Sequence, residues 1–179
     1  MCGLFFIISF YFCLPIYEKF TYNIYTSGRK WEKVVEMFYG SFIHNLDNKG
    51  RLVIPSKMRE ALGSKAYILK GYDGALSIYR ESDFEELVAK IKTLSFNKKN
   101  ARAHLRVQLA SVCELDIDKQ GRALLPTQLL AKYKIGKEVI VIGALDHIEV
   151  WNRKDYEAYE KAADSSFEDI AEELEEADD

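Results

Sequence analysis

Two short motifs in this 179-residue chain place an arginine four residues after an aspartate. The first motif is Asp47…Arg51, and the second, 71 residues further on, is Asp118…Arg122. Both follow the pattern D-x-x-G-R-x, then two hydrophobic residues and a proline. A charge-assisted contact between the two side chains can form across such a turn, and the glycine supplies the positive φ that the turn needs. The turn residues predicted from this pattern are Asp47, Gly50, Asp118 and Gly121.

The arginines carry the more specific chemistry. A guanidinium fork pairs with O6 and N7 of guanine in the major groove of DNA, and a two-stranded ribbon fits that groove. Neighbouring lysines and arginines are suited to phosphates, which position a protein on DNA without specifying the sequence. The predicted DNA-binding residues are Arg51, Lys49, Lys57, Arg59, Arg122 and Lys119. For the lysines, the alternative is that they form ordinary solvated surface. The second motif is less basic than the first, because Gln120, Gln128 and Leu130 stand at the positions of Lys49, Lys57 and Arg59.

A basic segment separates the two motif regions. Lys98, Arg102 and Arg106 recur at every fourth position, so a helix places them on one face, where they are candidates for contacts with the DNA backbone. Leu105 and Leu109 are predicted to pack inward. A solvated helix face is the alternative interpretation.

The elements that position the first motif follow from turn and strand signals. Strands are predicted at 42–46 and 51–54 as a hairpin around Asn48-Lys49-Gly50, followed by a short helix that Ser56 caps and Gly63 ends. A second hairpin joins 67–69 and 76–79. A capping box at Ser82 is predicted to open a helix that ends near Leu94.

The second motif heads the same succession of elements, in which Gly71 is expected to match Gly143. Four short strands cannot enclose a core by themselves. We therefore predict an α+β fold, mainly β, in which two copies of the unit pair with each other as an intramolecular pseudo-dimer and close a small barrel, with flanking helices.

From Met37 onward the chain resembles the MraZ family, bacterial regulators built from two SpoVT/AbrB-like swapped-hairpin modules. The residues that carry the resemblance are the duplicated D-x-x-x-R, the opening Met37-Phe38-Tyr39-Gly40 and the run L-D-x-K-G-R-L-x-I-P, and it extends roughly to Tyr159. It implies sequence-specific binding of double-stranded DNA at G-rich, TGGG-type direct repeats in the protein's own promoter, at the head of a division and cell-wall gene cluster. It also implies autoregulation, a ring-like homo-oligomer and a cytoplasmic, nucleoid-associated location.

On this basis the chain divides into five segments. Residues 41–84 and 112–155 are the two modules, and 85–111 is a helical basic linker. Residues 1–36 precede the region of resemblance, and 156–179 form an acidic tail.

Charge is distributed unevenly along the chain. Residues 37–156 have a net charge of +6, whereas 157–179 carry eleven acidic residues and one lysine. A basic body suits a nucleic-acid partner. The tail is predicted to be a frayed amphipathic helix or disordered, or else to compete for the basic DNA face.

Enzyme, metal and cofactor functions find little support. Three histidines stand in unrelated contexts, and there is no nucleophile–base arrangement or phosphate-binding glycine motif. Three scattered cysteines form neither a metal-ligand spacing nor a disulfide framework, which indicates a reducing compartment. We predict no enzyme activity, no cofactor and no metal.

The start of the chain is predicted to be mis-assigned: translation is expected to begin at Met37, so that residues 1–36 are not part of the protein. The apolar stretch 4–17 is too short for a membrane span and contains Pro15, so no membrane contact is expected. Lys30-Trp31-Glu32 must be encoded by AA[A/G]-TGG-GA, which contains TGGGA and resembles the family's DNA box. The alternatives are a genuine accessory extension and a membrane anchor.

Two other functions remain open at this stage. AbrB-like hairpins also serve as antitoxins or other DNA-binding interaction modules, although two modules in one chain argue against an antitoxin. A membrane-tethered structural protein rests on residues 4–17 alone.

Overall fold

The computed structural model describes residues 20–26, 29–35 and 37–177, in two compact units, 1–36 and 37–179. In the first unit, β1 (Phe20–Thr26) and β2 (Arg29–Val35) form an antiparallel hairpin. No element is predicted for this hairpin from the sequence, although Phe20, Tyr22 and Ile24 alternate with Thr21 and Asn23. The apolar stretch 4–17 lies outside the described residues.

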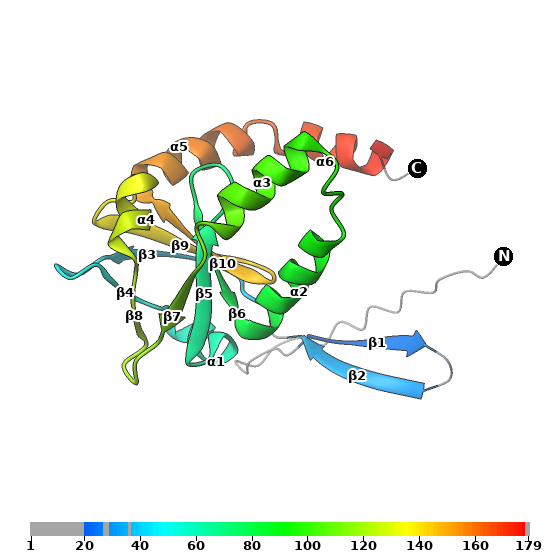
Figure 1. Ribbon diagram of the computed structural model, residues 1–179, viewed down its shortest axis with the longest axis horizontal. Helices are drawn as coiled ribbons and strands as arrows, with labels where there is room; N and C mark the ends of the chain where they lie inside the picture. The colour runs from blue at the N-terminus through cyan, green and yellow to red at the C-terminus, as the bar shows by residue number, and fades with distance from the viewer. Residues whose placement is uncertain (1–19, 27–28, 36, 178–179) are drawn as a thin grey trace. The chain divides into compact units, whose positions relative to one another are not determined.

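The second unit repeats one succession of elements twice (Figure 1). The first copy contains β3 (Ser41–Asn45), β4 (Arg51–Val53), α1 (Ser56–Leu62), β5 (Lys65–Lys70), β6 (Leu76–Arg80) and α2 (Glu81–Lys92). The linker helix is α3 (Lys99–Leu109). The second copy contains β7 (Cys113–Asp116), β8 (Arg122–Leu124), α4 (Thr127–Lys132), β9 (Glu138–Ala144), β10 (His147–Asn152) and α5 (Arg153–Asp164), and α6 (Phe167–Ala177) follows. The predicted α+β class and the duplicated unit are confirmed.

Strand pairing interlocks the two copies. One antiparallel sheet has the order β3-β9-β10-β6-β5-β7, and β4 pairs separately with β8. The first strand of each copy thus pairs with the hairpin of the other, β3 with β9 and β7 with β5, while β6 and β10 join the two halves. The predicted pseudo-dimer is therefore confirmed.

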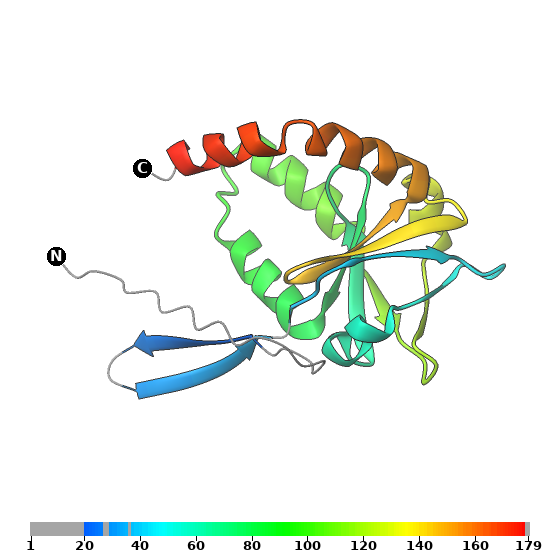
Figure 2. The ribbon, with the colours of Figure 1, turned by 180° about the vertical axis from the view of Figure 1, so that it is seen from behind.

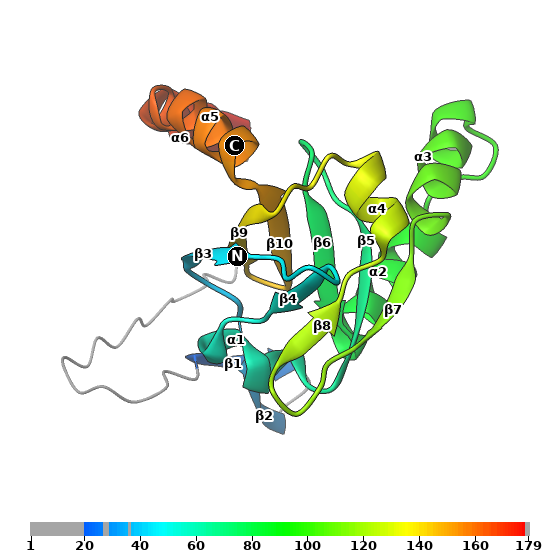
Figure 3. The ribbon, with the colours of Figure 1, turned by 90° about the vertical axis from the view of Figure 1, so that its left-hand side faces the viewer.

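The predicted hairpin between 42–46 and 51–54 is wrong in its pairing. The turn is present, but beyond it β3 runs into the six-stranded sheet and β4 crosses to β8. A three-residue strand such as β4 is stabilised more by pairing with the equivalent strand of the other copy than by pairing within a hairpin. The pairing between copies places its middle side chain inside the core that both copies share. Figure 3 shows β4 and β8 facing the sheet.

One hydrophobic core serves both copies. The inward residues of the ribbon, Leu52 and Ala123, are fully buried, and they join one cluster with sheet residues such as Ile68, Ile78 and Val141. The ribbon thus closes the open side of the sheet, and the small barrel needs residues from both copies to be filled.

Helix boundaries differ from the sequence prediction at two places. Ser56 is the first residue of α1 and makes no capping hydrogen bond, and α2 begins at Glu81, so Ser82 lies inside the first turn. The reason is that β6 runs directly into α2, with Arg80 in an extended conformation as the residue that precedes the helix. Gly63 ends α1 with a φ of 75°, as predicted.

The acidic tail is helical within the described residues. It comprises most of α5 and all of α6, which follow one another along one side of the unit (Figure 2). The apolar side chains of α6, Phe167, Ile170 and Leu174, are exposed.

His147 on β10 gives the fold a predicted dependence on pH. Its ring stacks on Tyr79, with Nδ1 2.7 Å from Asp146 Oδ1 and Nε2 3.5 Å from Glu149 Oε1. Burial lowers the pKa of His147, but the hydrogen bonds to Glu149 and Asp146 outweigh burial and raise it overall. Protonated His147 therefore stabilises the fold below its unfolded pKa of about 6.5, and this contribution is lost as the pH rises through the raised pKa.

We expect His147→Gln to lower the melting temperature most at pH 5 to 6, with the difference from wild type shrinking towards pH 9. Calorimetry across this range checks the trend. A difference that is constant with pH would contradict it.

Candidate nucleic-acid interface

The first motif holds its arginine with a tightly bonded aspartate. Asp47 Oδ1 accepts hydrogen bonds from the backbone N–H of Lys49 at 2.8 Å and of Arg51 at 2.9 Å, and Oδ2 accepts from Arg51 Nε at 2.6 Å. The backbone closes the same turn, since Gly50 N–H donates to the Asp47 carbonyl. Asp47 therefore shapes the turn and fixes the direction of the guanidinium.

The second motif repeats this geometry. Asp118 Oδ1 accepts from the backbone N–H of Gln120 and Arg122, and Oδ2 accepts from Arg122 Nε at 2.7 Å. The backbone hydrogen bond from Arg122, aided by its guanidinium, lowers the pKa of Asp118, and the equivalent bonds lower the pKa of Asp47 to about 2. Both carboxylates are therefore charged at neutral pH, and the contact expected from the motif is present in both copies.

The β4–β8 ribbon brings the two arginines onto one face. The register pairs Arg51 with Leu124, Leu52 with Ala123, and Val53 with Arg122. Opposite residues share a face and successive residues alternate, so with Leu52 and Ala123 buried, the other four side chains point outward. In each ion pair the aspartate accepts from the Nε–H of the guanidinium and not from a terminal amino group.

Each motif glycine is covered by a side chain from the first helix of the other copy. A Cβ at Gly121 would collide with the side chain of Arg59, whose Nε donates to the Ile54 carbonyl at 2.7 Å. At the equivalent place, a Cβ on Gly50 would lie 3.5 Å from Leu130 Cδ1. Arg59 thus packs against the second motif as Leu130 packs against the first, a role that the sequence pattern did not indicate.

The predicted lysines lie at exposed positions near the ribbon. Lys49 and Lys119 occupy the two motif turns, and Lys57 lies in the first turn of α1. Figures 1 and 2 show both turns projecting from one side of the unit, opposite α2. Together with the arginines, these lysines put the more basic half of the surface on the first copy.

The linker residues are not brought to the ribbon. α3 packs on β5, and Figure 3 shows it at the edge of the unit, away from β4 and β8. Lys98 precedes the helix in an extended conformation, Arg102 Nη1 donates to the Phe96 carbonyl, and Arg106 is exposed. Leu105 is buried as predicted, but Leu109 is 46% exposed, so its predicted inward packing is wrong.

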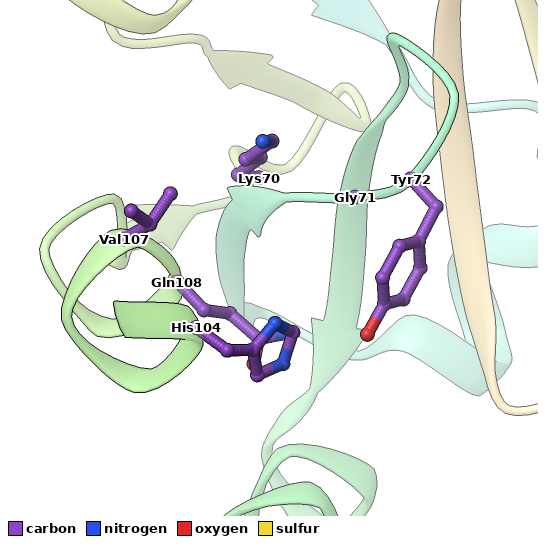
Figure 4. Close-up of a pocket in the computed structure, with 6 residues that line it drawn as sticks. All are labelled: Lys70, Gly71, Tyr72, His104, Val107 and Gln108. Atoms are coloured by element: carbon purple, nitrogen blue, oxygen red, sulfur yellow. The ribbon is translucent and has the colours of Figure 1, made fainter. Parts of the chain in front are cut away.

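A small pocket lies between α3 and the β5–β6 loop (Figure 4). Tyr72 and His104 stack in parallel there, with ring centroids 6.3 Å apart, and Gln108 is buried beside them. The cavity volume of this pocket is about 60 Å³, which is far below the several hundred Å³ of typical small-molecule sites. None of its lining residues belongs to the ribbon or the motif turns, so the pocket is separate from the candidate interface.

Two outward residues of the ribbon, Val53 and Leu124, were not among the predicted site residues. The period-two alternation around the buried Leu52 would have placed both of them on the arginine face. Among the described residues, no group of histidine, cysteine and acidic side chains is arranged to hold a metal ion. No helix in the described part of the chain is long and apolar enough to span a membrane.

Comparison with known proteins identifies the family. A family model described as "MraZ protein" and antitoxin-like matches residues 37–107 and again 109–177, which are the two copies with their following helices. Proteins named Transcriptional regulator MraZ from Caldanaerobacter subterraneus subsp. tengcongensis and Thermoanaerobacter sp. (strain X514) are 44% and 45% identical over 138 residues. In each case the match covers 77% of this chain and 96% of the relative. The duplicated motif, the interlocked copies and these matches together show that the chain belongs to the MraZ family.

Proposed function

We propose that this protein is a DNA-binding transcriptional regulator. The observation that carries the proposal is the outward face of the β4–β8 ribbon, where Arg51 and Arg122 are each held by an aspartate. A two-stranded ribbon fits the major groove, and arginine pairs with O6 and N7 of guanine, so this face is suited to guanine-containing sites. Relatives named transcriptional regulators support the same function.

The operator that we propose consists of G-rich, TGGG-type direct repeats upstream of the protein's own gene, which makes the regulation autoregulatory. Each ribbon strand has three residues, spanning about 10 Å or roughly three base pairs. One ribbon therefore reads too little DNA to select a site. A ring-like homo-oligomer that presents the same ribbon to successive direct repeats supplies the missing length, and we place it in the cytoplasm on the nucleoid.

A gel-shift assay with the full chain tests this function. The probe is the DNA upstream of its own gene, and the control is the same DNA with each guanine triplet replaced by adenines. We expect a discrete complex with the first probe at protein concentrations at which the control stays free. Equal binding of both probes would contradict sequence-specific recognition.

The first copy is expected to bind more phosphates than the second. Lys49→Gln together with Lys57→Gln gives the first copy the residues of the second, Gln120 and Gln128. We expect the slope of log affinity against log salt to fall by about 0.9 for each phosphate that the variant no longer neutralises. Titrations at several salt concentrations measure the slope.

Lys90→Gln with Lys92→Gln on α2 is the matched control, because it removes the same charge far from the motif turns. An equal slope change in both double variants would contradict the asymmetry. So would a larger change for Lys119→Gln in the second copy.

The antitoxin half of a toxin–antitoxin pair is the second candidate function. The family description as antitoxin-like favours it, and the exposed apolar side chains of α6 offer a protein partner a surface. Deleting the gene distinguishes the two. Death that is rescued by deleting a neighbouring gene is the antitoxin result, and altered transcription from its own promoter is the regulator result.

We also propose that translation begins at Met37. Both family matches fall within 37–177, and the relative from Caldanaerobacter subterraneus subsp. tengcongensis is matched over 96% of its own length by 138 residues of this chain. The expected intact mass of the protein expressed from its native locus is that of residues 37–179. A product that begins at Met1, or upstream DNA without a second TGGG-type box in direct repeat, would contradict this assignment.

A further inference from the structure

Two aliphatic side chains stand on the arginine face of the ribbon. Leu124 is 58% exposed and Val53 is 37% exposed. Single exposed aliphatic residues are common on protein surfaces and need no explanation by themselves. What distinguishes these two is their register, because Leu124 lies directly opposite Arg51 and Val53 directly opposite Arg122.

The four outward side chains form a compact pattern with arginines on one diagonal and aliphatic residues on the other. Diagonal neighbours on a strand pair lie about 7–8 Å apart, which is roughly two base-pair steps along DNA. Directly opposite neighbours are closer, at about 5 Å. An aliphatic side chain opposite an arginine therefore meets the base pair that the arginine reads or the next one.

The bases present one apolar group in the major groove, the C5-methyl of thymine. We propose that Leu124 contacts the C5-methyl group of a thymine adjacent to the guanine bound by Arg51, and so adds a thymine to the sequence that the ribbon selects. This inference rests on the proposed DNA-binding function. Leu124 is the residue that makes the contact because it is longer and more exposed than Val53.

The two copies differ at this outward aliphatic position, and the difference makes the preferred DNA site asymmetric. The first copy presents valine and the second presents leucine at equivalent positions of an otherwise matched ribbon. The stronger methyl contact therefore falls on the Arg51 side. A site with the thymine on that side binds more tightly than one with the thymine on the other, so a pseudo-symmetric ribbon reads an asymmetric sequence.

Deoxyuridine provides the test, because replacing thymine with it removes the methyl group and leaves base pairing intact. With the full chain and its upstream DNA as a fluorescent probe, each thymine near the guanines is replaced in turn and affinity is measured by anisotropy. We expect one position to lose about three- to tenfold for the wild type, the value of one apolar methyl contact. Leu124→Ala is expected to lose about as much on the thymine probe and to lose nothing further on the deoxyuridine probe.

Leu124→Val, which copies Val53, is expected to fall between the two, and Val53→Ala to keep the deoxyuridine sensitivity at that position. Melting curves should be unchanged, because the side chain is exposed. Equal sensitivity to deoxyuridine in wild type and Leu124→Ala overturns the inference, as does a wild type indifferent to every replacement. A wild type that does not bind the upstream DNA at all overturns the proposed function and the inference with it.

Discussion

Arg51→Ala is expected to abolish specific DNA binding while leaving the fold intact. Removing a bidentate arginine–guanine pair costs about 1–3 kcal/mol at each site, and an oligomer loses the pair at every ribbon that touches DNA. We therefore expect the affinity for the upstream probe to fall by at least about 100-fold. The side chain is one-third exposed and its ion pair with Asp47 lies at the surface, so the melting curve should be unchanged.

Two companion measurements sharpen this result. Arg51→Lys keeps the charge but not the fork, so it should retain binding to unrelated DNA and lose the preference for the operator. Probes with 7-deazaguanine lack the N7 acceptor, and they should weaken the wild type more than Arg51→Ala, in which only Arg122 of the two ribbon arginines can still use that acceptor. Specific affinity within threefold of wild type, with an unchanged melting curve, would rule out Arg51 as the reading residue.

Leu52→Ala is expected to have the largest effect on stability. Leu52 is fully buried at the centre of the ribbon, opposite Ala123, where the two copies meet. Truncating a buried leucine costs about 2–5 kcal/mol, which lowers the melting temperature by roughly 5–15 °C for a unit of this size. Because the core is shared, the variant should still unfold in one transition.

Leu124→Ala is the matched control, since it removes the same atoms from the outward face of the same ribbon. Its melting temperature should stay within about 2 °C of wild type. Two separate unfolding transitions in Leu52→Ala would show that the copies fold independently, contrary to the interlocked sheet. A loss no larger than that of the control would show that the ribbon is not part of the core.

The sequence predicted the repeated unit and the motif geometry well, because both depend on local signals. Asp47, Gly50 and Arg51 lie within five residues, and turn chemistry alone places them together. The partner of each strand could not be read in the same way. The short strands on either side of the Asp47 turn look like a hairpin, and only the filling of a shared core directs β4 to β8 and β3 to β9.

Spacing is also misleading at single residues. Spacing matches Gly71 to Gly143. In the structure, however, Gly143 pairs with Ile148, whereas the equivalent residue Leu76 pairs with Lys70. The residue equivalent to Gly143 by strand pairing is therefore Lys70, one position before Gly71. The loop of the first hairpin is longer, and this restores the register in the next strand. Arg59 of the first copy packs against Gly121 of the second. The sequence could not predict this contact between the copies, because the charge of Arg59 suggests only a phosphate contact.

The pairing of β3 with β9 affects how the chain folds while it is being synthesised. The two strands lie roughly a hundred residues apart in the chain, so at about 5–20 residues per second β3 waits on the order of ten seconds for its partner to leave the ribosome. During that interval the nascent first copy exposes an unpaired strand edge and an open core. Ribosomes that follow one another on the same messenger RNA hold such half-finished chains close together, and each chain offers the surface that another lacks. Because the two copies belong to one chain, the second copy emerges from the same ribosome as the first. It is then present at a higher local concentration than any neighbouring nascent chain, which favours pairing within the chain.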